Sequence, residues 1–315
     1  MEYVALGKTG LKVSRLCFGG LTVGPLQANL PVMKAAEVIL EAFRQGVNFI
    51  DTAELYQTYP HIAAALKTWD KEVIISTKTY AYDRNGAAKS LDKAQRELNR
   101  DVIDIFMLHE QESEWTLKGH REALEYFLEC KEKGIVKAVG ISTHHIAAVK
   151  AACLMGEIDV IHPIVNHRGL GIVDGSIGEM LRAIEAAYDK GIGIYAMKPL
   201  GGGNLINQFE ECLDYVLSIP CIHSIALGMQ SVEEVIANVS YFEDRNVKPE
   251  VVERLRTKKR SLHIDEWCEG CGDCLPACKH GAIYIEDGKL RVTAEKCILC
   301  GYCGSKCKNF AIKIV

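Results

Sequence analysis

Residues 104–142 read DIFMLHEQESEWTLKGHREALEYFLECKEKGIVKAVGIS and hold one copy of the unit that decides the fold. Asp104–Leu108 and Ala138–Ser142 are short apolar runs of the kind that form buried strands. Between them, Arg121–Lys133 has the longer pattern of a helix, and Gly134 follows where a left-handed helix end suits glycine. The segment therefore predicts a strand, a helix and a second strand, which is the unit of a parallel sheet.

The same alternation continues from about residue 14 to residue 242. We expect eight strands, at Leu16–Phe18, Asn48–Asp51, Val73–Thr77, Asp104–Leu108, Ala138–Ser142, Val160–Val165, Gly193–Met197 and Ser224–Leu227. We expect eight helices, at Met33–Gln45, His61–Lys67, Ser90–Leu98, Arg121–Lys133, His145–Cys153, Ser176–Lys190, Phe209–Leu217 and Ser231–Tyr241. Strict alternation predicts an α/β fold with a parallel sheet.

A closed (β/α)8 TIM barrel suits this pattern because closure leaves no sheet edge. A hairpin of Tyr3–Leu6 and Leu11–Val13 is expected before it. An open doubly wound sheet is the alternative, although no G-x-G-x-x-G run follows the first strand.

Composition limits the classes of function. The chain has 315 residues, of which 48% are hydrophobic and 25% are charged, enough for one large domain and a small one. A formal net charge of -4 gives no case for a nucleic-acid partner. The first ten residues show no export signal, and no apolar stretch is long enough to span a membrane. We therefore expect a cytoplasmic protein with no membrane span.

Polar side chains follow the second, third and fourth predicted strands. Asp51 ends the second strand, Tyr56 comes shortly after it, Lys78 ends the third strand and His109 follows the fourth. Chemistry in such barrels takes place at the carboxyl ends of the strands, so we expect these four side chains to meet. Singly, they could be a helix cap, a rim aromatic, a solvated lysine and a core histidine. Together they favour one shared site.

The D-T-A-x-x-Y run at 51–56, the strand-end Lys78 and Leu108-His109 resemble the catalytic residues of the aldo-keto reductases. The resemblance covers roughly residues 1–242. It implies that Tyr56 is the general acid for a carbonyl oxygen, that Lys78 and Asp51 form a buried pair beside it, and that His109 orients the carbonyl. The ammonium of Lys78 is expected to lower the pKa of the phenol toward the working range.

The same resemblance implies NADP or NAD as a cofactor. The nicotinamide carboxamide is expected near Ser142 and Thr143 and near His162 or Asn166. Met197 replaces the aromatic residue that usually stacks on the nicotinamide ring, and a thioether can still contact that ring.

The phosphates and adenine of the nucleotide are expected further along the barrel. Two glycine-containing turns could bring backbone amides to a pyrophosphate, with Lys198, Gly201 and Gly202 in the first and Gly228, Gln230 and Ser231 in the second. A plain flexible loop is the alternative for the first turn. Asn238 matches the adenine contact of the family. Basic residues for a 2'-phosphate are not evident and Glu234 would repel one, so we expect NADH to be tolerated.

Eight cysteines form two copies of C-x2-C-x2-C-x3-C. The copies, offset by 29 residues, are Cys268, Cys271, Cys274 and Cys278, then Cys297, Cys300, Cys303 and Cys307. The match continues in residues 281–285 and 310–314. This spacing is typical of [4Fe-4S] ligation, in which the fourth cysteine of each run binds the other cluster. One predicted ligand set is therefore Cys268, Cys271, Cys274 and Cys307, and the second is Cys297, Cys300, Cys303 and Cys278.

Zinc sites and disulfides are the alternatives for these cysteines. Zinc usually takes two separated pairs of ligands, and disulfides would need an exported chain. The stretch resembles a bacterial two-cluster ferredoxin, although Lys279 and Lys308 follow the fourth cysteines where proline is usual. We thus expect a small α+β ferredoxin-like iron–sulfur domain at 263–315. The other five cysteines stand singly among apolar neighbours and are expected to be buried thiols.

A polar linker is expected at 243–262, between the barrel at 1–242 and the cysteine-rich domain. It carries five positive charges, at Arg254, Arg256, Lys258, Lys259 and Arg260. A solvated helix face explains them, and a docking site for an acidic redox partner protein is the alternative.

These features together predict NAD(P)-linked reduction of a small aldehyde or ketone, or the reverse oxidation, by a protein that carries two clusters. A nicotinamide moves two electrons as a hydride and a cluster moves one, so direct exchange needs an adaptor such as flavin. Two alternatives stay open: a flavin- or ferredoxin-linked reductase fed by the clusters, and a non-catalytic electron-transfer protein. Loops such as 111–119 look short, which predicts an open mouth covered by the C-terminal domain or by another subunit.

Overall fold

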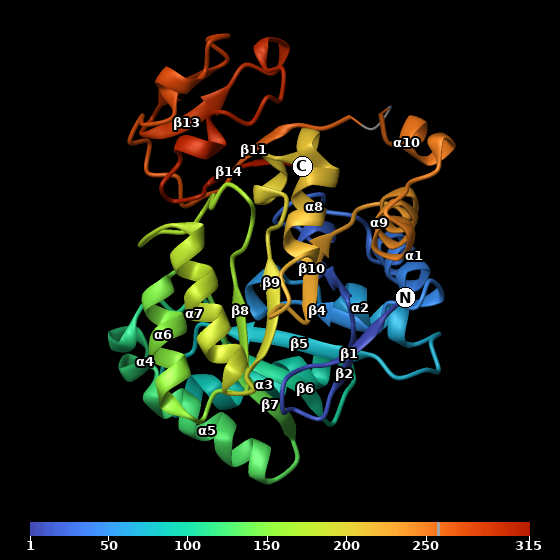
Figure 1. Cartoon of the computed structure of the whole chain (residues 1–315), viewed down its shortest axis with the longest axis vertical. Coiled ribbons are helices and arrows are strands. Elements are labelled where there is room, and N and C mark those ends of the chain that lie inside the picture. The colour runs from blue at the N-terminus through green and yellow to red at the C-terminus, as the bar shows by residue number, and fades with distance from the viewer. Residues whose placement is uncertain (257–258) are drawn as a thin grey trace.

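The computed structural model describes residues 1–256 and 259–315. Eight parallel strands close into a barrel in the order β10-β3-β4-β5-β6-β7-β8-β9 (Figure 1). They are β3 Leu16–Gly19, β4 Phe49–Asp51, β5 Ile74–Thr79, β6 Ile103–Leu108, β7 Val136–Thr143, β8 Val160–Pro163, β9 Gly193–Met197 and β10 Ser224–Gly228. Strand β10 pairs with both β3 and β9, which confirms the predicted barrel and excludes an open sheet.

Helices surround the barrel. They are α1 Val32–Arg44, α2 Tyr59–Leu66, α3 Arg84–Leu98, α4 Glu114–Gly119, α5 Arg121–Glu132, α6 Ile146–Met155, α7 Ile177–Asp189, α8 Phe209–Leu217, α9 Val232–Asp244 and α10 Pro249–Arg256. The hairpin of β1 Tyr3–Ala5 and β2 Lys12–Ser14 closes the end of the barrel where the strands begin. Its Leu6, Leu11 and Val13 are buried against inward-facing residues such as Phe49 and Tyr195. The opposite end, where the strands finish, is left for the site.

Two helices differ from the expected pattern. Helix α3 begins at Arg84, before the expected Ser90, because the side chain of Asp83 caps it by accepting from Gly86 N at 2.7 Å. The low helix propensity of Gly86 hid this start. The stretch at 111–119, expected to be a short loop, contains helix α4, which the side chain of Ser113 caps.

Residues 262–315 form a small unit, called the C-terminal unit below. It holds two antiparallel pairs of strands, β11 Leu262–Ile264 with β14 Ile312–Ile314 and β12 Ile283–Glu286 with β13 Lys289–Val292. Short 3₁₀ turns lie at η5 Leu275–Ala277, η6 Ala294–Lys296 and η7 Gly304–Lys306. Turns η5 and η7, and strands β12 and β14, start at equivalent positions of the two cysteine copies, so the sequence repeat is also a structural repeat.

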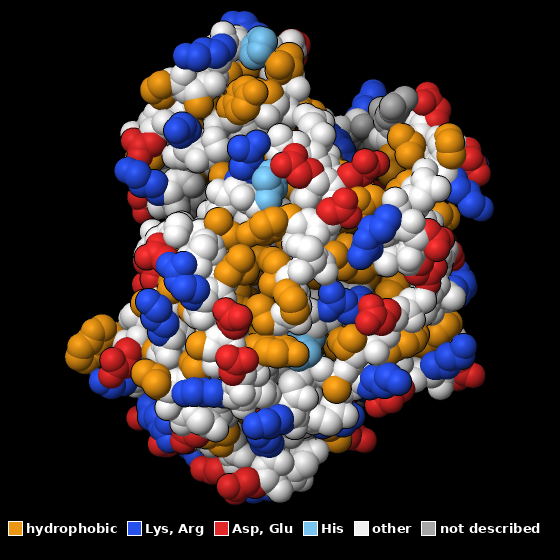
Figure 2. All heavy atoms as spheres, viewed as in Figure 1, with side chains coloured by type: hydrophobic (Ala, Val, Ile, Leu, Met, Phe, Trp, Pro, Cys, Tyr) orange, Lys and Arg blue, Asp and Glu red, His pale blue; other side chains and the backbone are white. Residues whose placement is uncertain are grey.

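The C-terminal unit is docked on the end of the barrel to which β8 and β9 point (Figure 1). Asn204 follows the short turn η3 Gly201–Gly203 and donates from Nδ2 to Ile312 O at 2.9 Å. A Cβ atom at Gly203 would overlap the carbonyl oxygen of Ile314, so only glycine allows this close approach. Figure 2 shows the unit as a lobe that projects from the body of the molecule, whose face carries charges of both signs.

The expected linker contains structure of its own. Helix α9 runs to Asp244, α10 lies within the linker, and β11 begins at Leu262. Of the predicted basic stretch, Lys258 lies outside the described residues. No helix in the described ranges is long and apolar enough to cross a membrane. The five scattered cysteines, Cys17, Cys130, Cys153, Cys212 and Cys221, are buried free thiols, as predicted.

Candidate active site

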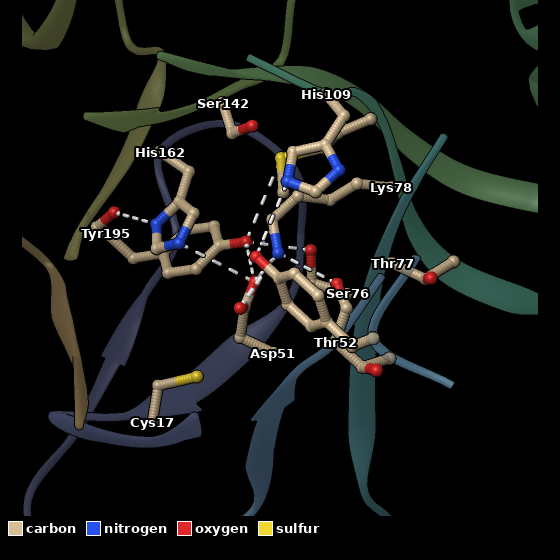
Figure 3. Close-up of polar contacts among 12 residues, drawn as sticks. Cys17, Asp51, Thr52, Ser76, Thr77, Lys78, His109, Ser142, His162 and Tyr195 are labelled. Atoms are coloured by element: carbon tan, nitrogen blue, oxygen red, sulfur yellow. Dashed lines mark hydrogen bonds and ion pairs between the residues drawn. The ribbon is translucent and has the colours of Figure 1, made fainter. Parts of the chain in front are cut away.

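A buried ion pair lies at the carboxyl ends of two neighbouring strands. The ammonium of Lys78, at the end of β5, lies 2.7 Å and 2.8 Å from the two carboxylate oxygens of Asp51, which ends β4. Lys78 also donates to Thr52 O at 2.8 Å, and its side chain is 1% exposed. Figure 3 shows these groups converging with His109. Because each charge is satisfied by the other, the pair fixes the position of the Lys78 ammonium inside the barrel.

Tyr56 ends the short turn η2 Glu54–Tyr56, which brings its phenol over this pair. Lys78 Nζ lies 5.0 Å from the centre of the phenol ring, and Tyr56 Oη lies 3.4 Å from His109 Nε2. Burial, followed by the negative charges of Asp51 and Glu110, raises the pKa of Tyr56 well above its ordinary value. The expectation of a lowered pKa for Tyr56 was wrong, because burial dominates and the charge of Asp51 adds to the rise.

His109 presents Nε2 to the phenol. Burial and then the positive charges of Lys78 and Lys198 lower the pKa of His109 well below its ordinary value, so the ring is neutral. Tyr80 stacks on it with ring centres 4.4 Å apart, and Tyr80 Oη donates to Glu110 at 2.6 Å. In the described part of the chain His109 Nδ1 is buried without a hydrogen-bond partner. No neighbouring acceptor within residues 1–256 and 259–315 requires a proton on Nδ1. The neutral ring can therefore carry its proton on Nε2, which faces Tyr56.

Tyr195 belongs to the site and was missed by sequence reasoning. It is fully buried in β9, its Oη donates to Asp51 Oδ1 at 2.7 Å, and its ring stacks on His162 at 3.9 Å. It therefore helps to orient the carboxylate that also binds Lys78. The signal was present, because Tyr195 stands two residues before Met197 and so faces the same side of the strand.

A pocket of about 880 Å³ starts at Asp51 and Tyr56. It passes His162 and Met197 and reaches Asn238 on α9. Burial lowers the pKa of His162 to about 4 in spite of the nearby Asp51, so this wall is uncharged. Among the described residues, Asn238 Oδ1 is buried with no partner, which leaves an acceptor for a ligand at the far end. The C-terminal unit lines the pocket with Ile298, Leu299, Lys313, Ile314 and Val315.

Ten of the residues expected to contact the cofactor fall into two groups, and the other two, Gly201 and Ser231, do not line the pocket. His162, Met197, Lys198, Gly202, Gly228, Gln230 and Asn238 line the pocket. Ser142, Thr143 and Asn166 instead bond to the protein's own backbone. Ser142 Oγ accepts from Glu110 N at 2.9 Å, Thr143 Oγ1 donates to Gln111 O at 2.5 Å, and Asn166 Nδ2 donates to Leu170 O at 2.9 Å. The side chains of Ser142, Thr143 and Asn166 thus hold the loops that follow β6 and β8.

The two turns that were expected to bind the phosphates make contacts within the chain, and these contacts differ between the two turns. Gly201 and Gly202 have left-handed backbones, and Gly202 packs against Phe310 of the C-terminal unit. At the start of α9, Ser231 Oγ accepts from Glu234 N at 3.3 Å, and the Glu234 carboxylate accepts from Gln230 N at 2.7 Å. The chain's own side chains therefore already satisfy this helix end.

The sequence predicted no basic residue in the region expected for a 2'-phosphate, but the structure has one there. Arg260, from the linker, places Nη2 3.3 Å from Glu234 Oε1, and both residues line the pocket. Sequence reasoning missed it because it searched only the helix after the last strand.

Comparison with known proteins agrees with this geometry. The sequence profile of the Aldo/keto reductase family matches residues 15–211. The chain belongs to the aldo/keto reductase family. L-galactose dehydrogenase of Arabidopsis thaliana is 25% identical over 289 residues, which cover 76% of this chain and 88% of that protein. NADH-specific methylglyoxal reductase of Escherichia coli (strain K12) is 26% identical over 243 residues, covering 69% and 72%.

The fold of this aldo-keto reductase is also that of solved relatives. The holo form of an aldo-keto reductase from Bacillus halodurans superposes with a TM-score of 0.65 and 21% identity, over 81% of this chain and 95% of that one. The protein is an aldo-keto reductase-type oxidoreductase, as the strand-end residues predicted.

The eight clustered cysteines of this aldo-keto reductase gather in two places. Cys278, Cys297, Cys300 and Cys303 line one small cavity. In the second place, burial raises the pKa of Cys274 to about 11, and the charges of Cys307, Cys271 and Cys268 add to the rise because they are close. Within the described residues, no group of three or more histidine, cysteine or acidic side chains is arranged to hold a single metal ion.

Proposed function

We propose that the barrel catalyses NAD(P)-linked reduction of a small aldehyde or ketone, or the reverse oxidation, with Tyr56 as the general acid. The observation that carries the proposal is the meeting of Tyr56 Oη, His109 Nε2 and the Lys78–Asp51 pair at one end of the pocket. The names of two relatives, a dehydrogenase and a methylglyoxal reductase, support this reaction class.

The pocket suits a dinucleotide. It is lined by Asp51 and Tyr56 of the tetrad (Asp51, Tyr56, Lys78 and His109) and by Asn238, whose unpartnered amide oxygen is an acceptor suited to the amino group of adenine. His162 and Met197 form the wall beside Tyr56, where the nicotinamide would lie. When bound, the reduced nicotinamide supplies the hydride. Arg260 suits the 2'-phosphate of NADP, and the carboxylate of Glu234 suits the free ribose hydroxyl of NAD. Either nucleotide would therefore have a binding partner here.

Tyr56 transfers the proton, assisted by Lys78 and His109. With a raised pKa, Tyr56 is a neutral phenol at pH 7 and can donate its proton to the carbonyl oxygen as the hydride reaches carbon. The tyrosinate left behind lies beside the Lys78 ammonium, which stabilises it. His109 donates a second hydrogen bond to the same oxygen and so fixes the carbonyl. In the reverse direction the tyrosinate accepts the proton.

The test is Tyr56→Phe, which keeps the ring and removes the donor. The kcat for a small aldehyde should fall by at least about 100-fold, the range of general acid catalysis. The Kd for NADH should stay within about twofold, because the ring still fills its space. Tyr82→Phe is the matched control, since that phenol is exposed and does not line the pocket. Turnover that survives Tyr56→Phe would remove Tyr56 from the reaction.

We also propose that the C-terminal unit holds two [4Fe-4S] clusters, with the crossed ligand sets predicted from the spacing. The cavity lined by Cys278, Cys297, Cys300 and Cys303 supports the second set, and the closeness of Cys307 to Cys274 supports the first. Backbone N–H groups of Ala282 and Ala311 lie 3.3 Å from the sulfurs of Cys278 and Cys307, as suits thiolate ligands. Such clusters would transfer single electrons, and their sensitivity to oxygen suggests a reducing cytoplasm.

Anaerobic purification followed by iron, acid-labile sulfide and flavin analysis tests this second proposal. About eight irons and eight sulfides per chain are expected from two cubanes. Zinc without sulfide would contradict it.

A flavin would favour the alternative in which the clusters feed the barrel through a one-electron adaptor. Ile298 and Leu299 support keeping that alternative, because they line both the cysteine cavity and the nucleotide pocket. A redox partner protein belongs to the same alternative.

A further inference from the structure

Lys198 is a half-buried cation that the proposed reaction does not use. It follows β9 with a left-handed backbone, φ 57°, and lines the same pocket as Tyr56. Its ammonium donates to His144 Nε2 at 2.8 Å. Burial and the charges of Lys198 and Lys313 lower the pKa of His144 well below its ordinary value, so the imidazole is a neutral acceptor. The hydrogen bond positions the lysine without cancelling its charge.

Phe310 brings a second lysine to the same place. Its ring centre lies 4.7 Å from Lys198 Nζ and 5.5 Å from Lys313 Nζ. The backbone of Phe310 is left-handed, φ 49°, where the equivalent residue of the first cysteine copy is Gly281. A large residue adopts this backbone at a cost of about 1–2 kcal/mol, so its ring is held here by the surrounding structure.

The charges at this junction do not balance. Lys313 forms an ion pair with Asp265, which also accepts from His263 Nε2 at 3.1 Å. Lys198 forms no ion pair with a carboxylate within the described ranges. The junction therefore holds two ammonium groups, one half-buried and one buried, and a single buried carboxylate, which pairs with Lys313. An uncompensated buried charge is costly, and an anion that enters the pocket beside Lys198 would remove that cost.

We propose that Lys198, positioned by His144, binds a carboxylate of the substrate, so that the preferred substrate is a small aldehyde or ketone that bears a carboxylate. This inference rests on the proposed carbonyl reduction. The pocket brings the anchor and the reacting groups together, since both Lys198 and Tyr56 line it and the charge of Lys198 is felt by His109. The pyrophosphate of the nucleotide is the competing anion, and the experiment separates the two.

The experiment compares 4-oxobutanoate with 4-oxobutanamide, which has nearly the same shape and no charge. The ratio of their kcat/KM values should favour the anion and should fall about tenfold or more in Lys198→Met, the loss expected for a charge-assisted hydrogen bond. Lys198→Arg should keep most of the preference. Lys118→Met, which changes an exposed lysine paired with Glu114, should leave the ratio unchanged. An unchanged ratio in Lys198→Met overturns the proposal, as does a Kd for NADH that weakens by the same factor.

The dependence on pH gives a second readout. Burial lowers the pKa of Lys198 to about 7, with Lys313 and Lys78 adding to the fall and Glu110 and Asp265 opposing it. The lysine is charged below this pKa and neutral above it. For 4-oxobutanoate, kcat/KM should therefore fall as the pH rises through about 7, whereas for 4-oxobutanamide it should not. Lys198→Arg should abolish the difference between the two profiles, and identical profiles in the wild-type protein overturn the proposal.

Binding separates this inference from the reaction. Succinate, titrated into the wild-type holoprotein by calorimetry, should bind more tightly than succinamide, and Lys198→Met should remove the difference. If no carbonyl is reduced but succinate still binds through Lys198, the proposed reaction fails while the anion site stands. If amides are reduced and succinate is not bound, the anion site fails alone.

Discussion

The two copies of the cysteine pattern share a backbone and differ in what they touch. Equivalent residues are left-handed in both: Gly270 and Leu299 with φ 63° and 54°, and Gly281 and Phe310 with φ 57° and 49°. The first copy uses glycine at both positions, whereas the second uses large apolar residues. Leu299 lines the pocket, and Phe310 packs against Gly171 and Gly202.

The next residues follow the same division. Tyr284 and Ile285 of the first copy are 44% and 36% exposed, and their equivalents Lys313 and Ile314 are 3% and 4% exposed. The cysteine spacing depends on the group that the thiols bind, which we propose is the same kind of cluster in both copies. The spacing is therefore the same in both copies. The residues between the cysteines depend on which copy faces the barrel. Where an internal repeat diverges, it therefore marks the docking surface, and the predictions below test the two sides of this difference.

The largest difference should come from Lys313 and Tyr284. Lys313→Met leaves the buried Asp265 without its ammonium partner and should lower the free energy of unfolding by about 3–5 kcal/mol. Tyr284→Met, at the exposed equivalent position, should change it by no more than about 0.5 kcal/mol. Anaerobic urea unfolding of both variants measures the two effects, and equal losses would show that the copies are not energetically distinct.

A comparison of Gly203 with Gly281 distinguishes two effects of adding a Cβ atom: a clash with a closely packed strand and strain in the backbone. Both have positive φ, but a Cβ atom at Gly203 would overlap Ile314, and one at Gly281 would meet open space. Gly281→Ala should lower the free energy of unfolding by about 1 kcal/mol through strain alone. Gly203→Ala should lower it by about 2 kcal/mol more, because the docked strand must shift. Urea titration gives both values, and a smaller loss at Gly203 would contradict tight docking.

The cysteines should differ in their effect on nucleotide binding. Cys297 precedes the pocket residues Ile298 and Leu299, whereas Cys268 lies in the first copy and does not line the pocket. Cys297→Ala should raise the Kd for NADH about tenfold, because the loop loses its anchor and its order. Cys268→Ala should raise it less than about twofold by the same reasoning. Fluorescence titration under anaerobic conditions compares them, and equal Kd values would mean that cluster and nucleotide sites are uncoupled.

The smallest expected difference lies between two variants of Phe310. Phe310→Ala and Phe310→Gly both remove the ring from the two lysines, and both should destabilise the protein by several kcal/mol. The glycine variant should be more stable than the alanine variant by about 1 kcal/mol, because only alanine retains the cost of the left-handed backbone. Thermal unfolding of the pair measures that cost. A more stable alanine variant would contradict the assigned strain at residue 310.

Sequence reasoning predicted the structure correctly where a local pattern repeats along the chain, and where the position of a residue at a strand end is enough to place its side chain. Eight alternating strands and helices predicted the barrel, and strand-end position predicted that Asp51, Lys78 and His109 would meet. It missed Tyr195, because a tyrosine inside a strand looks like any core aromatic until its hydroxyl is seen at Asp51. It also assigned Lys198 to the cofactor alone, since nothing local shows that its ammonium turns to His144.

By itself, the order of residues determined the barrel, the tetrad and the paired cysteine runs, because strand period, strand-end position and ligand spacing are properties of neighbours along the chain. Only the tertiary structure decided that the second cysteine copy forms a wall of the pocket that begins at Tyr56 and that Lys198, Lys313 and Phe310 meet beside it. These contacts join residues far apart in sequence, and they depend on how closely two surfaces approach. That approach is set by shape and burial across the whole molecule, which no single segment encodes.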